Sequence, residues 1–286
     1  MGIIITTAIF AVFLAFVLGA ALGFFQDFFK VEEDPRKSRI REVLPGANCG
    51  ACGYPGCDGY AAAVAAGEAE TNRCSVGGKA VTETISALLG VTASPTAAAV
   101  AVLACRGSAD HAPQKGDYRG LATCRGAKLS TGGTKLCLWG CLGFGDCVKI
   151  CQFGALSMGD DGLPRVDYGK CTGCKLCIGE CPQELLRDVP VDRTGALALC
   201  SNRNPLKAMV LKTCKTGCIK CELCVKNCPE QCIAMDKGIP LVDYTKCTSC
   251  GTCVSKCPTK VLRIIQPDVF PGTGGPVSAE AETAPA

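Results

Sequence analysis

The sequence has very little of the chemistry that enzymes use on small substrates. Its 286 residues include a single histidine, His111, which falls in a polar stretch where a surface loop is expected. No Gly-x-Gly-x2-Gly motif lies between a predicted strand and a predicted helix, and no nucleophile is arranged with a base. These absences argue against a flavin or NAD site and against a complete active site in this chain alone.

Cysteine, in contrast, is abundant and decides the broad class of protein. The chain has 25 cysteines, many of them in Cys-x2-Cys pairs. A disulfide framework is a poor interpretation, because the number is odd and no cleavable signal peptide is recognisable. Four thiolates also suit a structural zinc ion, but runs of four cysteines that end in proline favour iron–sulfur clusters.

Clusters would take the place of a large apolar core. Domains this small bury too little surface to be stable unaided, and each cluster cross-links four points of the chain. The formal charge of +4 is therefore misleading, since an oxidised cluster with four thiolates carries about −2 and five clusters add roughly −10. We expect the loaded protein to be acidic and the apoprotein to fold poorly.

An uncharged run of 23 residues, Ile3 to Phe25, is long enough for a helix to cross a bilayer. A signal peptide is the alternative, but the run has no basic region before it, is too long and offers no small-residue cleavage site. By the positive-inside rule, the basic residues after the run place the bulk of the chain on the cytoplasmic side of a prokaryotic inner membrane, behind a single pass. These residues are Lys30, Arg36, Lys37, Arg39 and Arg41.

Two stretches of the chain repeat each other at an offset of 76 residues: GLPRVDYGKCTGCKLCIGECP (162–182) and GIPLVDYTKCTSCGTCVSKCP (238–258). The segments before them align at an offset of 77, so that Cys137, Cys141, Cys147 and Cys151 fall on Cys214, Cys218, Cys224 and Cys228. The lengths suit two successive ferredoxin-like modules, each able to hold two clusters.

The sequence therefore predicts an α+β protein with one N-terminal transmembrane helix, a small 4Fe-4S domain and two ferredoxin-like two-cluster modules. Between the small domain and the modules, the apolar run AAAVAVLAC (97–105) is compatible with a buried strand or a further helix. We expect an anchor at 1–30 (helix about 3–25), a linker at 31–48, a 4Fe-4S domain at 49–78, a connecting segment at 79–133, module 1 at 134–190, an inter-module insert at 191–212, module 2 at 213–266 and a disordered tail at 267–286.

The second module follows the bacterial two-cluster motif, in which the fourth cysteine, just before proline, binds the other cluster. This crossed ligation predicts one cluster on Cys218, Cys221, Cys224 and Cys257, and another on Cys247, Cys250, Cys253 and Cys228.

The first module departs from this pattern in one half. Its regular cluster is expected on Cys171, Cys174, Cys177 and Cys151. The other half lacks the middle ligand, because Phe144 stands where Cys221 stands in the second module. We expect Cys137 to replace it, which gives the set Cys137, Cys141, Cys147 and Cys181.

The first cysteine group precedes both modules and holds Cys49, Cys52, Cys57 and Cys74. Three of these thiols lie on a glycine-rich loop, where the backbone can approach a cluster closely and donate hydrogen bonds to sulfur. A zinc knuckle is the alternative at this position.

The combination of these motifs resembles the RnfB/RsxB family, the B subunits of the Rnf-type ion-translocating oxidoreductases. The resemblance rests on the apolar run, CGACGYPGCDGYA (49–61), CLWGCLGFGDCVKIC (137–151) and the paired ferredoxin motifs, and covers nearly the whole chain. It implies a membrane complex that couples ferredoxin oxidation to NAD reduction and moves Na⁺ or H⁺. In such a complex this chain would accept electrons from soluble ferredoxin and pass them to other subunits, which hold the flavins and the NAD site.

Five cysteines stay outside the predicted groups. Cys105, Cys124, Cys200 and Cys214 flank the modules, and docking of these segments would build a sixth cluster beside the five expected above. Buried packing thiols are the alternative. Cys232 aligns with Ala155 and is interpreted as a packing residue.

Two other functions remain compatible with the sequence: a structural iron–sulfur scaffold, and a polyferredoxin subunit of a membrane hydrogenase or related reductase. Nothing suggests binding to nucleic acid. Several lysines crowd the first half of the second module, where they would either steer an acidic ferredoxin or form a solvated basic face. They are Lys207, Lys212, Lys215, Lys220 and Lys226.

Overall fold

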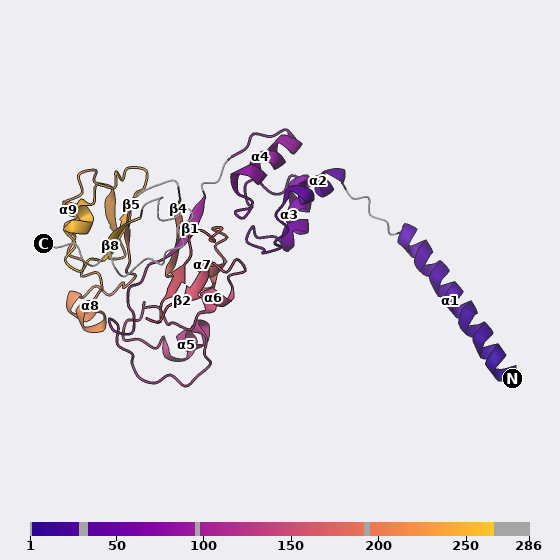
Figure 1. The fold of residues 1–286 in the computed structure, drawn as a ribbon, viewed down its shortest axis with the longest axis horizontal. Coiled ribbons are helices and arrows are strands. Elements are labelled where there is room, and N and C mark those ends of the chain that lie inside the picture. The colour runs from indigo at the N-terminus through magenta and orange to yellow at the C-terminus, as the bar shows by residue number, and fades with distance from the viewer. Residues whose placement is uncertain (1, 29–33, 95–97, 192–194, 266–286) are drawn as a thin grey trace.

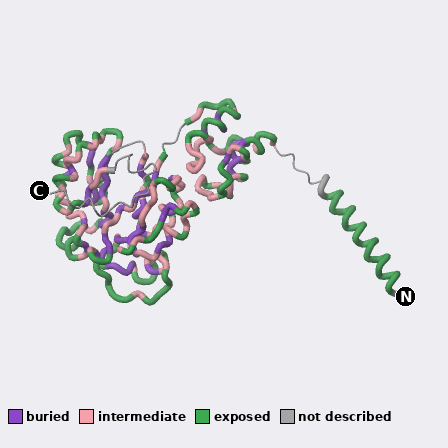
Figure 2. Tube along the Cα trace, viewed as in Figure 1, coloured by how far each residue is buried: buried purple, intermediate pink, exposed green. Residues whose placement is uncertain are grey.

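The N-terminal apolar run forms one long helix, α1 (Gly2–Phe28), in the computed structural model, which describes residues 2–28, 34–94, 98–191 and 195–265 (Figure 1). From Ile4 to Phe25 the helix has a mean hydropathy of 2.6, and it is the one helix in these ranges long and apolar enough to span a membrane. Its described side chains are exposed, as lipid contact would require (Figure 2).

Three helices form a small domain after the anchor: α2 (Pro35–Val43), α3 (Gly56–Ala65) and α4 (Gly78–Leu89). The side chain of Asp34 accepts a hydrogen bond from the Arg36 amide, which caps the start of α2. Helix α2 lies in the stretch predicted as a linker, and it contacts both α3 and α4. The fully buried Tyr60 joins the parts of the domain, because its hydroxyl donates to the Glu70 carbonyl at 2.9 Å and accepts from the Arg73 amide at 3.2 Å.

The rest of the described chain contains four two-stranded antiparallel sheets, two in each half of the repeat. In each half the two middle strands form a hairpin, and the first strand pairs with the last. The first half contains β1 (Ala99–Leu103) paired with β4 (Leu186–Pro190), and β2 (Leu156–Met158) paired with β3 (Pro164–Val166). The second contains β5 (Gly195–Ala198) paired with β8 (Leu262–Ile265), and β6 (Ile233–Asp236) paired with β7 (Ile239–Val242).

The first strand of each half comes from outside the stretch predicted as a module. The apolar run 97–105, for which strand and helix were both open, contributes β1, and the predicted inter-module insert contributes β5. Each strand buries apolar side chains between the halves, where Val102 of β1 and Leu197 of β5 join one cluster of buried residues. The connecting segment and the insert thereby bring cysteines beyond the two repeated motifs into the packed structure.

Six short helices lie between the strands and cysteine motifs of the described chain, and five of them each contain one cysteine. Helix α6 contacts α7 in the first half (Figure 1), and α9 contacts α10 in the second. The predicted disordered tail, 267–286, lies outside the described residues. The helices are α5 (Cys124–Thr131), α6 (Asp146–Lys149), α7 (Leu176–Glu180), α8 (Lys207–Thr213), α9 (Leu223–Lys226) and α10 (Thr252–Ser255).

Candidate iron–sulfur centres

The structure places 24 of the 25 free cysteines in six groups of four, and the remaining one, Cys232, lines the same pocket as the last group. We number these groups as sites 1 to 6. Site 1 is Cys49, Cys52, Cys57 and Cys74; site 2 is Cys151, Cys171, Cys174 and Cys177; site 3 is Cys124, Cys141, Cys147 and Cys181. Site 4 is Cys105, Cys137, Cys200 and Cys214; site 5 is Cys218, Cys221, Cys224 and Cys257; site 6 is Cys228, Cys247, Cys250 and Cys253.

The arrangement of the thiols does not favour a single ion. Sites 2 to 6 each line a pocket between cysteine-bearing segments. Bonds of 2.3 Å to one zinc ion would bring four sulfurs to about 3.8 Å from one another. Among the described residues, no three Cys, His, Asp or Glu side chains converge closely enough to hold a single metal ion.

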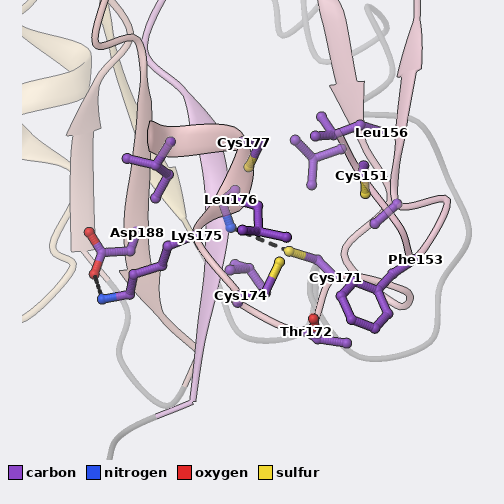
Figure 3. Close-up of a pocket in the computed structure, with 16 residues that line it drawn as sticks. Cys151, Phe153, Leu156, Cys171, Thr172, Cys174, Lys175, Leu176, Cys177 and Asp188 are labelled. Carbon is purple, nitrogen blue, oxygen red and sulfur yellow. Dashed lines mark hydrogen bonds and ion pairs between the residues drawn. The ribbon is translucent and has the colours of Figure 1, made fainter. Parts of the chain in front are cut away.

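Site 2 lies between the loop 171–177 and the hairpin of the first half (Figure 3). It contains the four cysteines that crossed ligation predicts for the regular cluster of this module. The Ala101 amide of β1 donates to the Cys171 sulfur at 3.5 Å, so the first strand also contributes to the site. Burial raises the pKa of the Cys177 thiol to about 12. Metal binding would therefore have to displace the proton of this thiol.

Site 3 contains Cys124, which the sequence did not assign to it. Cys124 is the first residue of α5, and its amide donates to the Asp146 carboxylate at 2.7 Å. In return, the backbone amides of Phe144 and Asp146 donate to the Cys124 sulfur. Because Asp146 directly precedes Cys147, this exchange fixes the start of α5 against the cysteine loop and supplies the ligand that is missing at position 144.

Cys137 is consequently placed elsewhere than predicted. The sequence put it with Cys141, Cys147 and Cys181, and put Cys124 with the unassigned cysteines. In the structure the two exchange places, so that Cys137 lines site 4 and Cys124 lines site 3. The physical reason is the docking of α5, which brings Cys124 across 22 residues of chain to Asp146.

Site 4 takes two cysteines from each half of the repeat. Cys105 lies two residues after β1, and Cys200 lies two residues after β5. Cys137 and Cys214 are the pair that the sequence aligns at an offset of 77. The repeat therefore predicted that these two cysteines are equivalent, although it did not show that they face each other across the junction of the modules.

Hydrogen bonds to sulfur are dense at site 4 and follow the repeat. The Cys105 sulfur accepts from the Gly107 amide at 3.3 Å, and the Cys200 sulfur accepts from the Asn202 amide at 3.5 Å. The side chain of Asn202, which is buried, also donates to the Cys137 sulfur at 3.5 Å. Burial raises the pKa of the Cys137 thiol to about 11, so this group is a neutral thiol at pH 7 unless a metal binds it.

Sites 5 and 6 contain the sets that crossed ligation predicts for the second module. Cys228, from the first motif, lies with the cysteines of the second motif, while Cys257 reaches back to the first. Site 6 also has a fifth sulfur beside it, because Cys232 is buried and its sulfur lies 3.5 Å from that of Cys228. Cys250 is the one exposed cysteine among the 25.

Site 1 belongs to the small helical domain. The Cys74 sulfur accepts a hydrogen bond from the Gly77 amide at 3.4 Å. Burial raises the pKa of the Cys74 thiol, and the charges of the other three cysteines of the group raise it further. The loop before α3 turns at Gly53, whose φ of +88° strains any residue with a side chain. The Asn48 side chain accepts from the Cys57 amide at 2.8 Å and closes this loop.

Comparison with known proteins identifies iron–sulfur domains in three segments of this chain. Family models match residues 44–76 (an Fe-S cluster domain), 164–187 (a 4Fe-4S binding domain) and 217–261 (a 4Fe-4S dicluster domain). The B subunit of the Na⁺-translocating ferredoxin:NAD⁺ oxidoreductase complex of Acetobacterium woodii is 39% identical over 86% of this chain and 73% of its own length. The B subunit of the proton-translocating ferredoxin:NAD⁺ oxidoreductase complex of Clostridium ljungdahlii is 38% identical over 85% of each chain. The chain belongs to the RnfB family of ion-translocating oxidoreductases.

In this member of the RnfB family, backbone amides of one site donate hydrogen bonds to sulfurs of the next. The Cys218 amide of site 5 donates to the Cys200 sulfur of site 4 at 3.3 Å. The equivalent contact in the first half joins the Cys141 amide of site 3 to the Cys105 sulfur of site 4. Site 4 is therefore in direct hydrogen-bond contact with a site in each module.

The remaining sites of this RnfB-family chain continue the same row. Sites 2 and 3 meet where α7, with Cys177, contacts α6, with Cys147. Sites 5 and 6 meet where α9, with Cys224, contacts α10, with Cys253. Burial raises the pKa of the Cys174 thiol in site 2, and a charge on Cys49 in site 1 raises it further, so sites 1 and 2 lie near each other. The chain is an Fe–S electron-transfer subunit whose six candidate sites follow one another from 1 to 6.

Proposed function

We propose that this chain holds six 4Fe-4S clusters and transfers electrons from a reduced ferredoxin to the membrane part of a ferredoxin:NAD⁺ oxidoreductase complex. The observation that carries the proposal is the uninterrupted row of six four-cysteine sites. Support for the donor and the acceptor comes from the named relatives, which are subunits of ferredoxin:NAD⁺ oxidoreductase complexes. A 4Fe-4S cluster supplies one-electron chemistry when it is bound.

The residues of the chain itself have three tasks in this function. The cysteines bind iron, and the backbone amides of Ala101, Gly107 and Gly77 donate to their sulfurs, which favours the more negative, reduced state of a cluster. The strands β1 and β5 bury the centre of the row and exclude water from it. No group in these contacts needs to react with a substrate.

The membrane helix orients the chain in this proposal. Basic residues follow α1, and the positive-inside rule then places the six sites on the cytoplasmic side, where a soluble ferredoxin is found. Two of these residues are held in the small domain, since Arg41 pairs with Asp58 at 2.9 Å and Arg36 pairs with Asp34 at 2.7 Å. The other subunits of the complex are the expected membrane partners.

The sixth site distinguishes this proposal from a chain with five clusters. Site 4 has four thiols around a pocket, hydrogen bonds to its sulfurs from several backbone amides, and contacts to sites 3 and 5. A full-length chain, purified without oxygen in detergent, should contain about 24 iron atoms with six cubane clusters and about 20 with five. A value near 20 would assign site 4 to packing thiols.

A redox titration of the same preparation separates electron transfer from a structural role. An electron-transfer subunit should show several clusters that reduced ferredoxin reduces, as followed by electron paramagnetic resonance. A scaffold should hold its iron but show no cluster that ferredoxin reduces. The second outcome would leave the clusters in place and refute the function.

A further inference from the structure

One buried and one half-buried lysine lie at the contacts that site 4 makes with its neighbours. Lys135 is 4% exposed, and its ammonium group donates to the Gly107 carbonyl at 2.5 Å. Lys220 is half-buried in the first cysteine loop of the second module, and its ammonium group donates to the Asn204 carbonyl. Neither lysine forms an ion pair with a carboxylate among the described residues.

A buried ammonium group is costly unless an anion compensates it. Burial raises the pKa of Cys105 in site 4 and of Cys141 in site 3, and the charge of Lys135 opposes that effect at both thiols, so the lysine lies near both sites. Burial lowers the pKa of Lys220, which lines site 5, and the charges of Cys218 in site 5 and Cys200 in site 4 oppose that effect. Thiolates that bind a cluster would supply the anions for both lysines. Lys135 thus lies between sites 3 and 4, and Lys220 lies between sites 4 and 5.

The backbone fixes Lys135 at this position. It forms an isolated antiparallel bridge with Gln114, and the amides of Lys115 and Leu136 bond to carbonyls on either side of that bridge. The carbonyl that Lys135 binds belongs to Gly107, whose amide donates to the Cys105 sulfur. The ammonium group and the sulfur are therefore held by the two ends of one residue.

The repeat supplies an internal comparison for this lysine. Position 212 is equivalent to position 135 at the offset of 77, and Lys212 is exposed. The same residue type is thus buried against cysteines in one half and solvated in the other. A cation next to a cluster stabilises its reduced, more negative form and so raises its reduction potential, and the effect is largest where water is excluded.

We infer that Lys135 and Lys220 tune the potentials along the row, so that site 4, which faces both cations, is held more positive than either neighbour. An added electron is then more stable at the junction of the modules than at site 3 or site 5. This inference rests on the proposed cluster at site 4. The lysines act through the cysteines and are positioning residues.

The test is a redox titration of the full-length chain with neutral and charged variants at each lysine. Lys135→Gln should make sites 3 and 4 harder to reduce, by about tenfold or more in the equilibrium constant, which is 59 mV for one electron. Lys220→Gln should have the same effect on sites 4 and 5. The signal of site 4 is identified by its loss in Cys200→Ala, that of site 3 in Cys124→Ala and that of site 5 in Cys221→Ala.

Charge-preserving variants separate tuning from a structural role. Lys135→Arg and Lys220→Arg should keep potentials near those of the unmodified chain, and Lys212→Gln should change none of the six. The inference is overturned if Lys135→Gln keeps all its iron and leaves the potentials of sites 3 and 4 unchanged, or if the two Gln variants do not both shift site 4. Absence of a cluster signal that depends on Cys200 would instead refute the proposed cluster at site 4 itself.

Discussion

The exchange of Cys124 and Cys137 between sites 3 and 4 leads to a prediction that two double variants decide. In the structure Cys105 and Cys137 line the same site, whereas Cys105 and Cys124 line different sites. The grouping predicted from the sequence has the opposite pattern, with Cys105 and Cys124 together and Cys137 with the ligands of the first module. The two groupings therefore differ in which pair of substitutions damages one cluster and which damages two.

The expected magnitude follows from counting sites. Cys105→Ala/Cys137→Ala removes two ligands from site 4 alone and should leave five intact cubane clusters. Cys105→Ala/Cys124→Ala removes one ligand from each of two sites and should leave four. Since each cubane has about 4 iron atoms, the first variant should retain about 20 of about 24 iron atoms in intact clusters and the second about 16.

The assay is a Mössbauer count of intact cubane clusters in the full-length chain, prepared without oxygen, with the three single variants measured alongside. Each single variant should lose one cluster, so the losses should add for Cys105 with Cys124 but not for Cys105 with Cys137. The reverse pattern, with four clusters after the Cys137 pair and five after the Cys124 pair, would refute the assignment drawn from the structure.

Three further predictions concern residues outside these two sites. Cys232→Ala should leave the iron content unchanged, because Cys228 already completes site 6; a loss of about four iron atoms would make Cys232 a ligand. Lys215→Glu should slow reduction by ferredoxin about two- to tenfold at low salt and not at high salt, because this exposed lysine directly follows Cys214 of site 4; an equal loss with the exposed Lys79→Glu of the small domain would show that the site of the charge does not matter. Tyr60→Phe should lower the unfolding free energy of the loaded small domain by about 2 kcal/mol, since the Glu70 carbonyl loses its buried partner; an unchanged denaturant midpoint would contradict this role.

Local patterns were enough to predict the parts of this protein whose residues are close in sequence. The apolar run 3–25 indicated a long helix, and the structure has α1 there. The motif around Cys218 to Cys228 and its partner around Cys247 to Cys257 predicted the grouping of sites 5 and 6, including the crossed fourth cysteine. In these motifs the spacing itself determines which thiols share a cavity.

The features that the sequence did not determine depend on docking between distant segments. Position 144 clearly lacked a cysteine, but nothing near it showed that Asp146 would hold the start of α5 and bring Cys124 to the empty position. Cys137 is nearer to position 144 along the chain than Cys124 is, so the sequence alone favours Cys137 as the replacement. The repeat at the offset of 77 did contain a usable signal. Cys137 is equivalent to Cys214, and neither cysteine belongs to the regular ligand motif of its module.

The first strands were also hard to predict from the sequence, because they depend on contacts between distant segments. The run 97–105 was too short for periodicity to separate strand from helix, and its partner, β4, lies more than 80 residues away. Lys135 was also inconspicuous in the sequence, since a lysine in a polar stretch is normally solvated. Its burial follows from the bridge to Gln114, which is a long-range backbone contact.

The central claim is that one row of six clusters in this chain receives electrons from ferredoxin. It is tested most directly by Mössbauer spectroscopy of the full-length, iron-57-labelled chain in lipid nanodiscs, before and after addition of reduced ferredoxin. We expect about 24 iron atoms in cubane clusters, with several clusters changing from the oxidised to the reduced spectrum. A chain with about 20 iron atoms, or one whose spectrum reduced ferredoxin leaves unchanged, would contradict the account.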